Sequence, residues 1–398
     1  MPWSTITLTV TTPMFCGGAD QHAEARVPSL RGAMRFWFRA LAGHALGDNL
    51  AGIAKAETAV FGDTERSAPI LIRIRHPVQA TENRSPAFVT RTTRDRFPGI
   101  AYLLGPGLTD RINRQTVLTR GYIDVGTPIH VQLRRRPHCT DHAWDLTLSS
   151  LWLLCNFGGL GARVRRGFGG LAITGLDGLT LPEHLASPAA QLSMKNYDQL
   201  FALDPTVLLP GAVHAIQDLA QTPTAPRSWG RRSSFPVLGP SHTRSLLYFD
   251  RDDRWDTWEQ AMLVTGYDTR IFRADTEVST ARYPLKRKTH EWLDVVHGSE
   301  TQFPLGAMGL PVIFKEYEVN AIHGHQKTRR ASPLWLRFIH TDNQWYLFSI
   351  LFRTQFFPSI TDLPRVQLTS PQGNRTLVVD DAALDALERG WFETGVRR

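Results

Sequence analysis

The first part of the chain alternates apolar and polar residues in four short stretches. This pattern is typical of a strand with one buried face, because successive side chains of a strand point to opposite sides. The four predicted strands are Ile6–Val10, Pro69–Arg75, Ile129–Leu133 and Leu171–Thr174. Strands of this length are typical of a small sheet.

Apolar residues three or four positions apart predict two helices between these strands. The first follows Pro28, with Ser29 as its predicted N-cap, and ends near Leu46; the second spans Asp141–Phe157. Residues 79–128 are rich in Arg, Thr, Gly and Pro, which predicts an irregular insertion. The resulting order, β-α-β-β-α-β, is that of a ferredoxin-like domain, which RNA-recognition domains also use.

The second part has a less regular pattern. We expect helices over 182–203, 253–272, 280–296 and 381–392, a loop over 219–249, and strands over 310–317, 333–339 and 345–352. A helix, a glycine-bearing loop and a strand follow one another near 297–317, as they do near 157–174. We therefore predict an α+β fold of two tandem ferredoxin-like (RRM-like, βαββαβ) domains with insertions. The first would span 1–178 and the second, degenerate one 179–398.

The distribution of charge is the first feature that bears on function. The 398 residues include 45 Lys and Arg and 37 Asp and Glu, which gives a net charge of +8. Residues 1–176 carry 21 basic and 12 acidic residues, a net of +9, and residues 177–398 carry 24 and 25, a net of −1. A GC-rich genome would enrich arginine in both parts. The asymmetry therefore favours a surface that binds a polyanion, with nucleic acid as the first candidate.

Other features restrict the compartment and the chemistry. The three cysteines form an odd number without a C-x-x-C pair, which argues against a disulfide framework and a thiolate zinc site. The N-terminus lacks the basic start of a signal peptide, and the longest uncharged apolar stretch, 146–162, holds Ser, Asn and three glycines. We expect a cytoplasmic protein without membrane contact, metal or cofactor.

Residues 158–170, which we call the glycine–arginine loop, hold six glycines, three arginines and no acid. Glycine lets the backbone approach a ligand, while successive N–H groups and guanidinium forks suit phosphate. The loop is not a Walker A motif, because no Gly-Lys-Ser/Thr follows. We predict RNA contacts from Gly161, Arg163, Arg165 and Arg166, with Phe168 free to stack on a base. The alternative is a flexible surface loop with solvated arginines.

A stripe of arginines is predicted on the first helix. Arg31, Arg35 and Arg39 are spaced i, i+4 and i+8, and no acid occurs between Ala25 and Gly47. Like charges at this spacing repel by a few tenths of a kcal/mol per pair. Acids from elsewhere in the fold, or a polyanion, would offset this cost; for the stripe as a set we favour the polyanion.

A nuclease is the alternative from another functional class. Cleavage without metal needs a general base and a general acid, usually histidine, and the candidates are His22 and His44. No second partner stands at a recognisable spacing from either. His323 and His325 precede the basic residues Arg329 and Arg330, but no third metal ligand is evident. That segment is therefore interpreted as an exposed basic loop that adds to the RNA-binding surface.

Several segments together resemble the RAMP superfamily, and within it the first subunit of the Cmr module of type III-B CRISPR RNA-guided effector complexes. The matching segments are Thr12–Asp20, Pro28–Ala42, Val60–Gly62, Ala101–Gly105, the glycine–arginine loop and Ala331–Trp335. The resemblance is dense over 1–176 and thin beyond, apart from 304–340. The Pro28–Gly32 run and the glycine–arginine loop together are its most specific part.

The resemblance implies two ferredoxin-like domains and a non-catalytic RNA-binding role. It implies assembly with other RAMP subunits around a CRISPR guide RNA, near the 3′ end of the guide, and contact with target RNA. By position, the arginines of the stripe and of the loop would hold RNA phosphates. In some RAMP proteins the function is instead cleavage of precursor guide RNA, which is the metal-independent endoribonuclease alternative.

Overall fold

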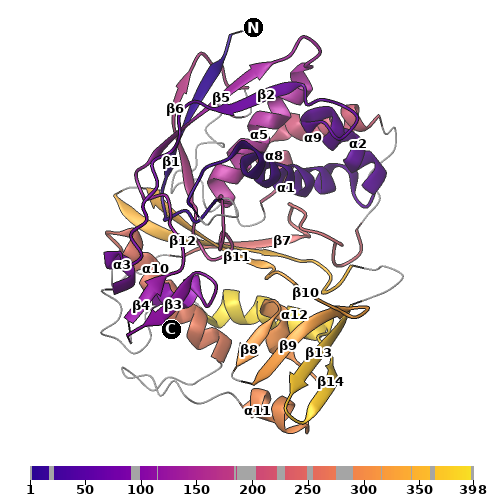
Figure 1. Cartoon of the computed structure of the whole chain (residues 1–398). Coiled ribbons are helices and arrows are strands. Elements are labelled where there is room, and N and C mark those ends of the chain that lie inside the picture. The colour runs from indigo at the N-terminus through magenta and orange to yellow at the C-terminus, as the bar shows by residue number, and fades with distance from the viewer. Residues whose placement is uncertain are drawn as a thin grey trace.

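The structure is a computed structural model. It describes residues 2–17, 22–90, 99–113, 115–182, 185, 203–221, 229–248, 254–274, 290–314, 316–341, 343–358 and 364–395. Figure 1 shows an upper part, made mostly from the first half of the chain, and a lower part from the second half. An antiparallel sheet crosses the molecule between them.

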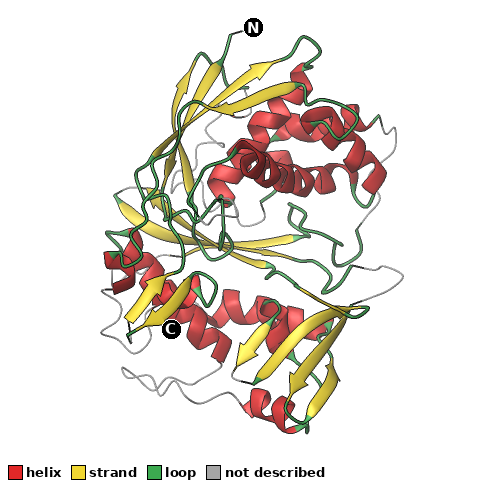
Figure 2. Cartoon of the chain, in the orientation of Figure 1, coloured by secondary structure: helices red, strands yellow, loops and turns green. Residues whose placement is uncertain are grey.

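The upper part is one four-stranded sheet with helices on one face (Figures 1 and 2). Its order is β2-β5-β1-β6, and all neighbours are antiparallel. The strands are β1 (Ser4–Val10), β2 (Ile70–Ile74), β5 (Pro128–Arg135) and β6 (Leu171–Asp177). The helices are α1 (Val27–Leu46), α2 (Leu50–Phe61), α5 (Asp141–Phe157), α8 (Pro205–Leu208) and α9 (Pro210–Ala220). The four predicted strands and both predicted helices of this part are confirmed.

Two local details differ from the expectations. Helix α1 begins at Val27, after Arg26, so the predicted N-cap Ser29 already lies within the first turn. Pro28 explains the earlier start, because a proline has no N–H to leave unpaired there. Helix α2 was not predicted; its N-cap is Asn49, whose Oδ1 accepts the N–H of Gly52 at 2.9 Å.

The middle sheet has the order β11-β12-β7, from β7 (Thr243–Tyr248), β11 (Leu334–Thr341) and β12 (Gln344–Phe352). It is covered on both faces. Trp335 and Phe352 belong to the apolar core of the upper part, whereas Leu336 and Phe338 belong to a second core below. The predicted strands over 333–339 and 345–352 are confirmed. The prediction of a loop over 219–249 is wrong for β7, which pairing with β12 holds in place.

The lower part contains a second antiparallel sheet, ordered β10-β9-β13-β14, with β8 paired to β9. Its strands are β8 (Val312–Phe314), β9 (Tyr317–His323), β10 (Gln326–Thr328), β13 (Arg365–Ser370) and β14 (Gly373–Leu377). Around it lie α10 (Trp258–Ala274), α11 (His290–His297), η3 (Pro304–Met308), α12 (Asp381–Arg389) and η4 (Gly390–Gly395). The predicted helix over 182–203 and the first ten residues of that over 280–296 fall almost wholly outside the described residues.

The predicted insertion over 79–128 forms the short elements α3 (Ala87–Thr90), α4 (Gly99–Leu104), β3 (Thr109–Ile112) and β4 (Gln115–Leu118). These elements pack into the lower core, with α4 against α10. Conversely, α9 packs into the upper core. The chain is thus an α+β protein with antiparallel sheets, as predicted, in which each core draws on both halves of the sequence. No helix among the described residues combines the length and the apolarity that crossing a membrane requires.

Candidate nucleic-acid interface

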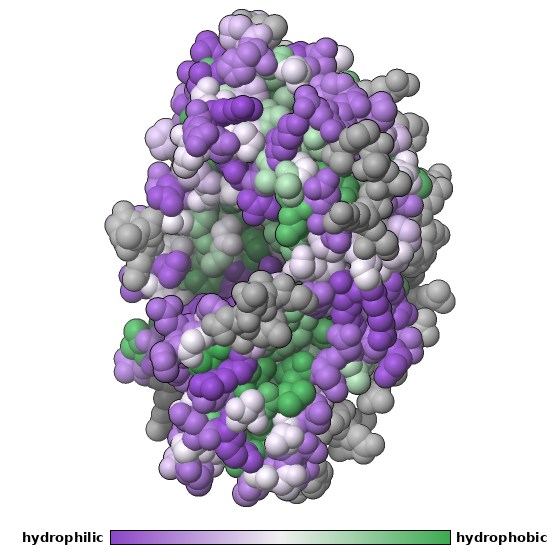
Figure 3. Space-filling view, turned by 90° about the vertical axis from the view of Figure 1, so that its right-hand side faces the viewer, coloured by the Kyte–Doolittle hydropathy of each residue, from purple (hydrophilic) through white to green (hydrophobic). Residues whose placement is uncertain are grey.

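The glycine–arginine loop lies where the upper part meets the middle sheet. It follows α5, returns the chain into β6 and touches the outer edge of β11 on the way. The N–H of Leu336 on β11 donates to the carbonyl oxygen of Arg165 at 3.1 Å, and Arg166 forms a parallel bridge with Leu336. The loop is therefore part of the junction between the two halves. A space-filling view shows a hollow at this mid-height of the molecule (Figure 3).

The glycines of the loop let the protein's own chain approach. Gly161 has a φ of +101°, and a Cβ there would lie 2.6 Å from the carbonyl oxygen of Phe15. Gly167 has a φ of +87°, and a Cβ there would lie 2.2 Å from the ring of Phe338. The N–H of Ala162 donates to the Phe15 carbonyl at 2.8 Å. At Gly161 the glycine lets the backbone of residue 15 approach, while Gly161 itself is exposed, so its predicted RNA contact stays a prediction.

Two of the three loop arginines bind backbone carbonyls. Arg165 donates from Nη1 to the oxygen of Ser332 at 2.6 Å, and Arg166 donates to the oxygen of Leu103 at 3.1 Å. Burial lowers the pKa of each guanidinium to about 10, and for Arg166 the charge of Arg163 adds to the effect. These two side chains fasten the loop to both halves, which corrects the expectation that both are free for phosphate.

Two other predicted contact residues are buried. Phe168 is 1% exposed and packs edge-on against Phe15, with ring centroids 5.6 Å apart, so no face of its ring is open to a base. Arg330 is 9% exposed and donates to the oxygens of Phe356 and Ala331, at 3.1 and 2.9 Å. Stacking by Phe168 and direct phosphate contact by Arg330 are therefore corrected, because core packing and backbone carbonyls occupy both side chains.

Three other arginines at the junction have no carboxylate partner among the described residues: Arg163, Arg273 and Arg329. Arg163 lies beside Gly105 and Gly107, and its pKa is lowered by burial and then by the charge of Arg329. Arg273, in the last turn of α10, is close enough to lower the pKa of Arg166. Arg329 is exposed after β10. Positive charge therefore accumulates here, and no carboxylate in the described part of the chain pairs with it.

The arginine stripe of α1 has a different arrangement. Arg39 binds the carboxylate of Glu57 on α2 through Nε and Nη2, at 2.5 and 2.8 Å, and Arg35 donates to the same carboxylate at 2.8 Å. The bond to Glu57 raises the pKa of Arg39. Acids from elsewhere in the fold thus offset the charge of Arg35 and Arg39, which corrects the expectation that the whole stripe faces a polyanion. Arg31 has no carboxylate partner within the described ranges.

The candidate histidines bind the scaffold. His22 is exposed, with its Nδ1 3.3 Å from Oε1 of Glu82. His44 is partly buried, with its Nδ1 3.2 Å from the carbonyl oxygen of Leu238. No group of three His, Cys, Asp or Glu side chains suited to a metal ion occurs within the described stretches.

Comparisons with known proteins bear on this geometry. The profile of the RAMP superfamily matches residues 7–172. The CRISPR system Cmr subunit Cmr1-2 of Pyrococcus furiosus is 33% identical over 172 residues, which are 41% of this chain and 90% of that protein. The chain belongs to the Cmr1 family of the RAMP superfamily.

Two further matches extend the comparison. Subunit Cmr1-1 of the same organism is 30% identical over 154 residues, which are 38% of this chain and 41% of that protein. The crystal structure of Cmr1 from Pyrococcus furiosus in its apo form aligns over 92% of this chain and 94% of that chain. Its TM-score is 0.56 at 18% identity, a likeness of fold.

Sequence reasoning missed three residues of this Cmr1-family chain, one at the arginine stripe and two at the junction. Glu57 lies in α2, which was not predicted; Asn49, a residue type that favours the N-cap position, could have indicated where this helix begins. Arg337 on β11 is 5% exposed and donates to the oxygens of Cys155 and Leu171, at 2.8 and 2.6 Å. Arg273 lies in the last turn of α10, one residue beyond the predicted helix over 253–272. Only the folded chain brings Arg337 and Arg273 near residues 155–171, so no local pattern marks them.

Proposed function

We propose that this Cmr1-family chain is a non-catalytic RNA-binding subunit of a type III-B CRISPR effector complex. It would hold the 3′ region of the guide RNA, the guide–target duplex, or both, through phosphate contacts. The observation that carries the proposal is the set of uncompensated arginines at the junction, Arg163, Arg273 and Arg329.

The physical argument is one of charge balance. Arg163 is partly buried and lies near the like charge of Arg329, and both effects raise the free energy of the folded chain. A phosphate strand laid along the junction would relieve this cost, and the planar donors of arginine match phosphate oxygens. Arg165, Arg166 and Arg330 would act as positioning residues, because their bonds to carbonyls fix the loop beside the strand. Contacts of this kind position a strand without selecting its sequence.

The architecture supports the tandem part of the proposal. The upper sheet, numbered by its own strands, has the order 2-3-1-4, which is the ferredoxin-like order. The succession β7, α10, β11 and β12 forms the middle sheet with the order 2-3-1 and no fourth strand. A second, degenerate ferredoxin-like domain describes this arrangement. We place the boundary near residue 178, with α9 and the segment around α4 packed across it.

The proposed partners are guide RNA, target RNA and other RAMP subunits, in the cytoplasm. The relatives from Pyrococcus furiosus are named as subunits of the CRISPR Cmr system, which supports assembly with further subunits. Apart from Arg273 and Arg329 at the junction, the nearly neutral second part, with a net charge of −1 over 177–398, suits protein contacts better than RNA contacts.

A binding titration with the double variant Arg163→Ala/Arg329→Ala tests the proposal. We expect the affinity for single-stranded RNA to fall at least tenfold. The slope of log affinity against log salt should fall by about 1.4, since each neutralised phosphate contributes about 0.7. Filter binding at several KCl concentrations measures both quantities. The matched control is Arg365→Ala, an exposed arginine at the start of β13. Unchanged affinity in the double variant, or an equal loss in the control, would contradict the proposal.

The same reactions test the nuclease alternative. Labelled precursor RNA recovered from them should be intact, with or without Mg²⁺, because His22 and His44 are each engaged with the scaffold. Fragments that disappear in His22→Ala would favour the endoribonuclease.

A further inference from the structure

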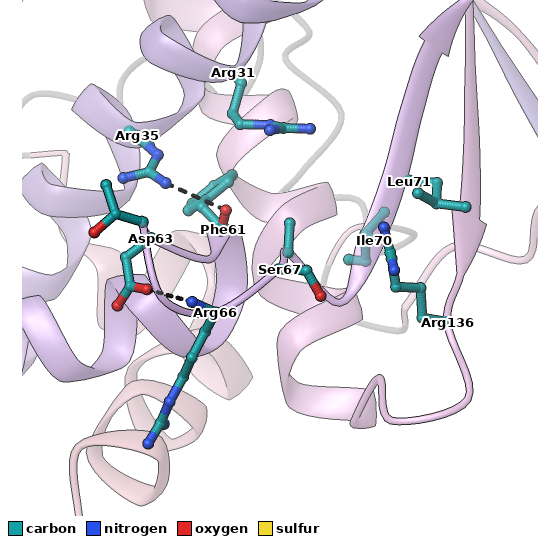
Figure 4. A pocket seen from close by; sticks show the side chains of 11 residues that line it. Arg31, Arg35, Phe61, Asp63, Arg66, Ser67, Ile70, Leu71 and Arg136 are labelled. Atoms are coloured by element: carbon teal, nitrogen blue, oxygen red, sulfur yellow. Dashed lines mark hydrogen bonds between the residues drawn. The ribbon is translucent and has the colours of Figure 1, made fainter.

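A cavity of about 580 Å³ opens in the upper part, away from the glycine–arginine loop. It lies between the first turns of α1, the segment that joins α2 to β2, and the end of β5 (Figure 4). Its size is in the range of small-molecule sites. None of the loop residues 158–170 lines it. The cavity is therefore separate from the junction.

Two arginines enter this cavity from different elements. Arg31 comes from α1 and Arg136 from the residue after β5, and their guanidinium groups extend into the same space from opposite sides (Figure 4). The Nε atoms of both are buried, and neither has a hydrogen-bond partner among the described residues. Burial, followed by the charge of Arg35, lowers the pKa of Arg31. Two buried donors that converge without an acceptor require an anion or ordered water.

The other charged residues of the cavity are already engaged or face elsewhere. Arg35 donates to Glu57 and to the carbonyl oxygen of Gly62, the latter at 2.5 Å. The carboxylate of Asp63 accepts the N–H groups of Glu65 and Arg66, which lowers its pKa. The side chain of Arg66 points away from Arg31 and Arg136 (Figure 4). The Asp63 carboxylate is therefore engaged by the N–H groups of its own turn. The guanidinium groups of Arg31 and Arg136 remain as the main charged groups inside the cavity.

The remaining wall is of mixed character. Ser67, exposed, offers a hydroxyl, and Ile70 and Leu71 at the start of β2 offer apolar surface. Two guanidinium forks, one hydroxyl and an apolar wall suit a phosphate group attached to a nucleoside better than they suit a bare inorganic ion.

We propose that this cavity is a phosphate-binding pocket in which Arg31 and Arg136 grip the phosphate of a nucleotide. The nucleotide is either free or the terminal residue of an RNA strand. The pocket would act separately from the proposed RNA contacts at the junction, so that each can fail without the other.

A thermal-shift titration of the full chain tests the pocket. Uridine monophosphate and inorganic phosphate, added at constant ionic strength against chloride, should raise the melting temperature of the wild-type protein. Arg31→Gln and Arg136→Gln should each abolish most of the shift. Neither substitution should lower the melting temperature without ligand, because each removes a partly buried cation that has no partner among the described residues. The control Arg75→Gln, which removes an exposed arginine just after β2, should retain the shift.

The two sources of the phosphate are separated with RNA oligonucleotides. If the source is an RNA end, RNA with a terminal phosphate should bind at least threefold tighter than the same RNA with a hydroxyl end, and Arg31→Gln should remove the difference. If the source is a free nucleotide, uridine monophosphate should shift the melting temperature, but the terminal phosphate should not change the affinity for RNA. Either result supports the pocket and identifies the source of the phosphate.

The proposal is overturned if neither ligand shifts the melting temperature of the wild-type protein. It is also overturned if the shift persists in both Arg31→Gln and Arg136→Gln. The double variant Arg163→Ala/Arg329→Ala should keep the shift, since these residues do not line the cavity. A loss there would assign the shift to the junction and overturn the pocket as well.

Discussion

Two regions of the molecule concentrate arginine, and they treat its charge in opposite ways. At the junction, Arg163, Arg273 and Arg329 have no carboxylate partner among the described residues. Around a cavity of about 900 Å³ beside α12, four arginines form ion pairs with acids. The pairs are Arg232 with Asp381 and Asp385, Arg231 with Asp385, Arg353 with Glu388, and Arg244 with Glu388 and Glu393.

The difference shows that arginine density along the sequence does not by itself indicate a polyanion site. Residues 219–249 contain no acid, just as the glycine–arginine loop contains none. In the fold, however, acids of α12 pair with the arginines of the first segment, whereas no carboxylate among the described residues pairs with those of the second. The informative quantity is the charge that remains after folding.

Removing a carboxylate from the paired region should have the largest effect. Glu388 is buried and receives three hydrogen bonds from Arg353, at 2.7 to 3.2 Å. Glu388→Gln should lower the free energy of unfolding by about 3 kcal/mol, because it leaves a partly buried cation unpaired. Urea denaturation measures this loss, with the exposed Glu393→Gln as the control, for which we expect less than about 0.5 kcal/mol. RNA affinity should not change; a joint loss would show that the two regions are not distinct.

Adding a carboxylate at the junction should give its arginines an acidic partner, as the arginines beside α12 already have. In Arg329→Glu a carboxylate replaces a cation whose charge acts on Arg163. We expect RNA affinity to fall about tenfold, or about 1.4 kcal/mol, while stability stays equal or rises by about 0.5 kcal/mol. Arg329→Gln should give a smaller loss of affinity than Arg329→Glu. Equal affinity in all three proteins would remove Arg329 from the proposed site.

The smallest expected effect is a pH dependence confined to the paired region. Burial, then the charges of His44 and Arg353, lower the pKa of His242, which lines the cavity beside α12. Below its ordinary value of about 6.5 the unfolded chain binds a proton that the folded chain resists. Stability is therefore lost as the pH falls from 6.5 through the lower folded pKa.

The variant His242→Asn should lose less stability than the wild-type protein between pH 7 and pH 5. The difference should be below about 1 kcal/mol in parallel urea titrations, because His242 is only partly buried. Identical acid profiles for the two proteins would contradict the assignment.

The sequence predicts the upper part of the fold well, for local reasons. Strand β1 alternates buried and half-buried residues along its whole length, and α5 has both a cap at Thr140 and a continuous apolar side. Helix α2 escapes prediction because several of its positions are Ala or Gly, which weakens its apolar stripe. Strands β13 and β14 are largely polar, and pairing with β9 and with each other holds them rather than any pattern.

The candidate site was harder to predict than the fold. The residue types at the loop indicate positive charge, and Arg163 keeps that charge uncompensated. Whether a neighbouring arginine binds a carbonyl or a carboxylate of the protein depends on contacts between residues more than 150 positions apart. The bond from Arg165 to Ser332 is an example. Phe168 shows the same limit: flanking glycines suggest an open ring, but the lower core encloses it.

The contact between the glycine–arginine loop and β11 also has a consequence for association. The middle sheet ends at β11, and an open strand edge of this kind is a template for pairing with another polypeptide. The bond from Leu336 to Arg165 occupies part of that edge from within the same chain. In a protein whose relatives are named as subunits, this contact leaves fewer free backbone groups at the edge of β11 for a strand of another chain. Neighbouring subunits would then have to bind other surfaces.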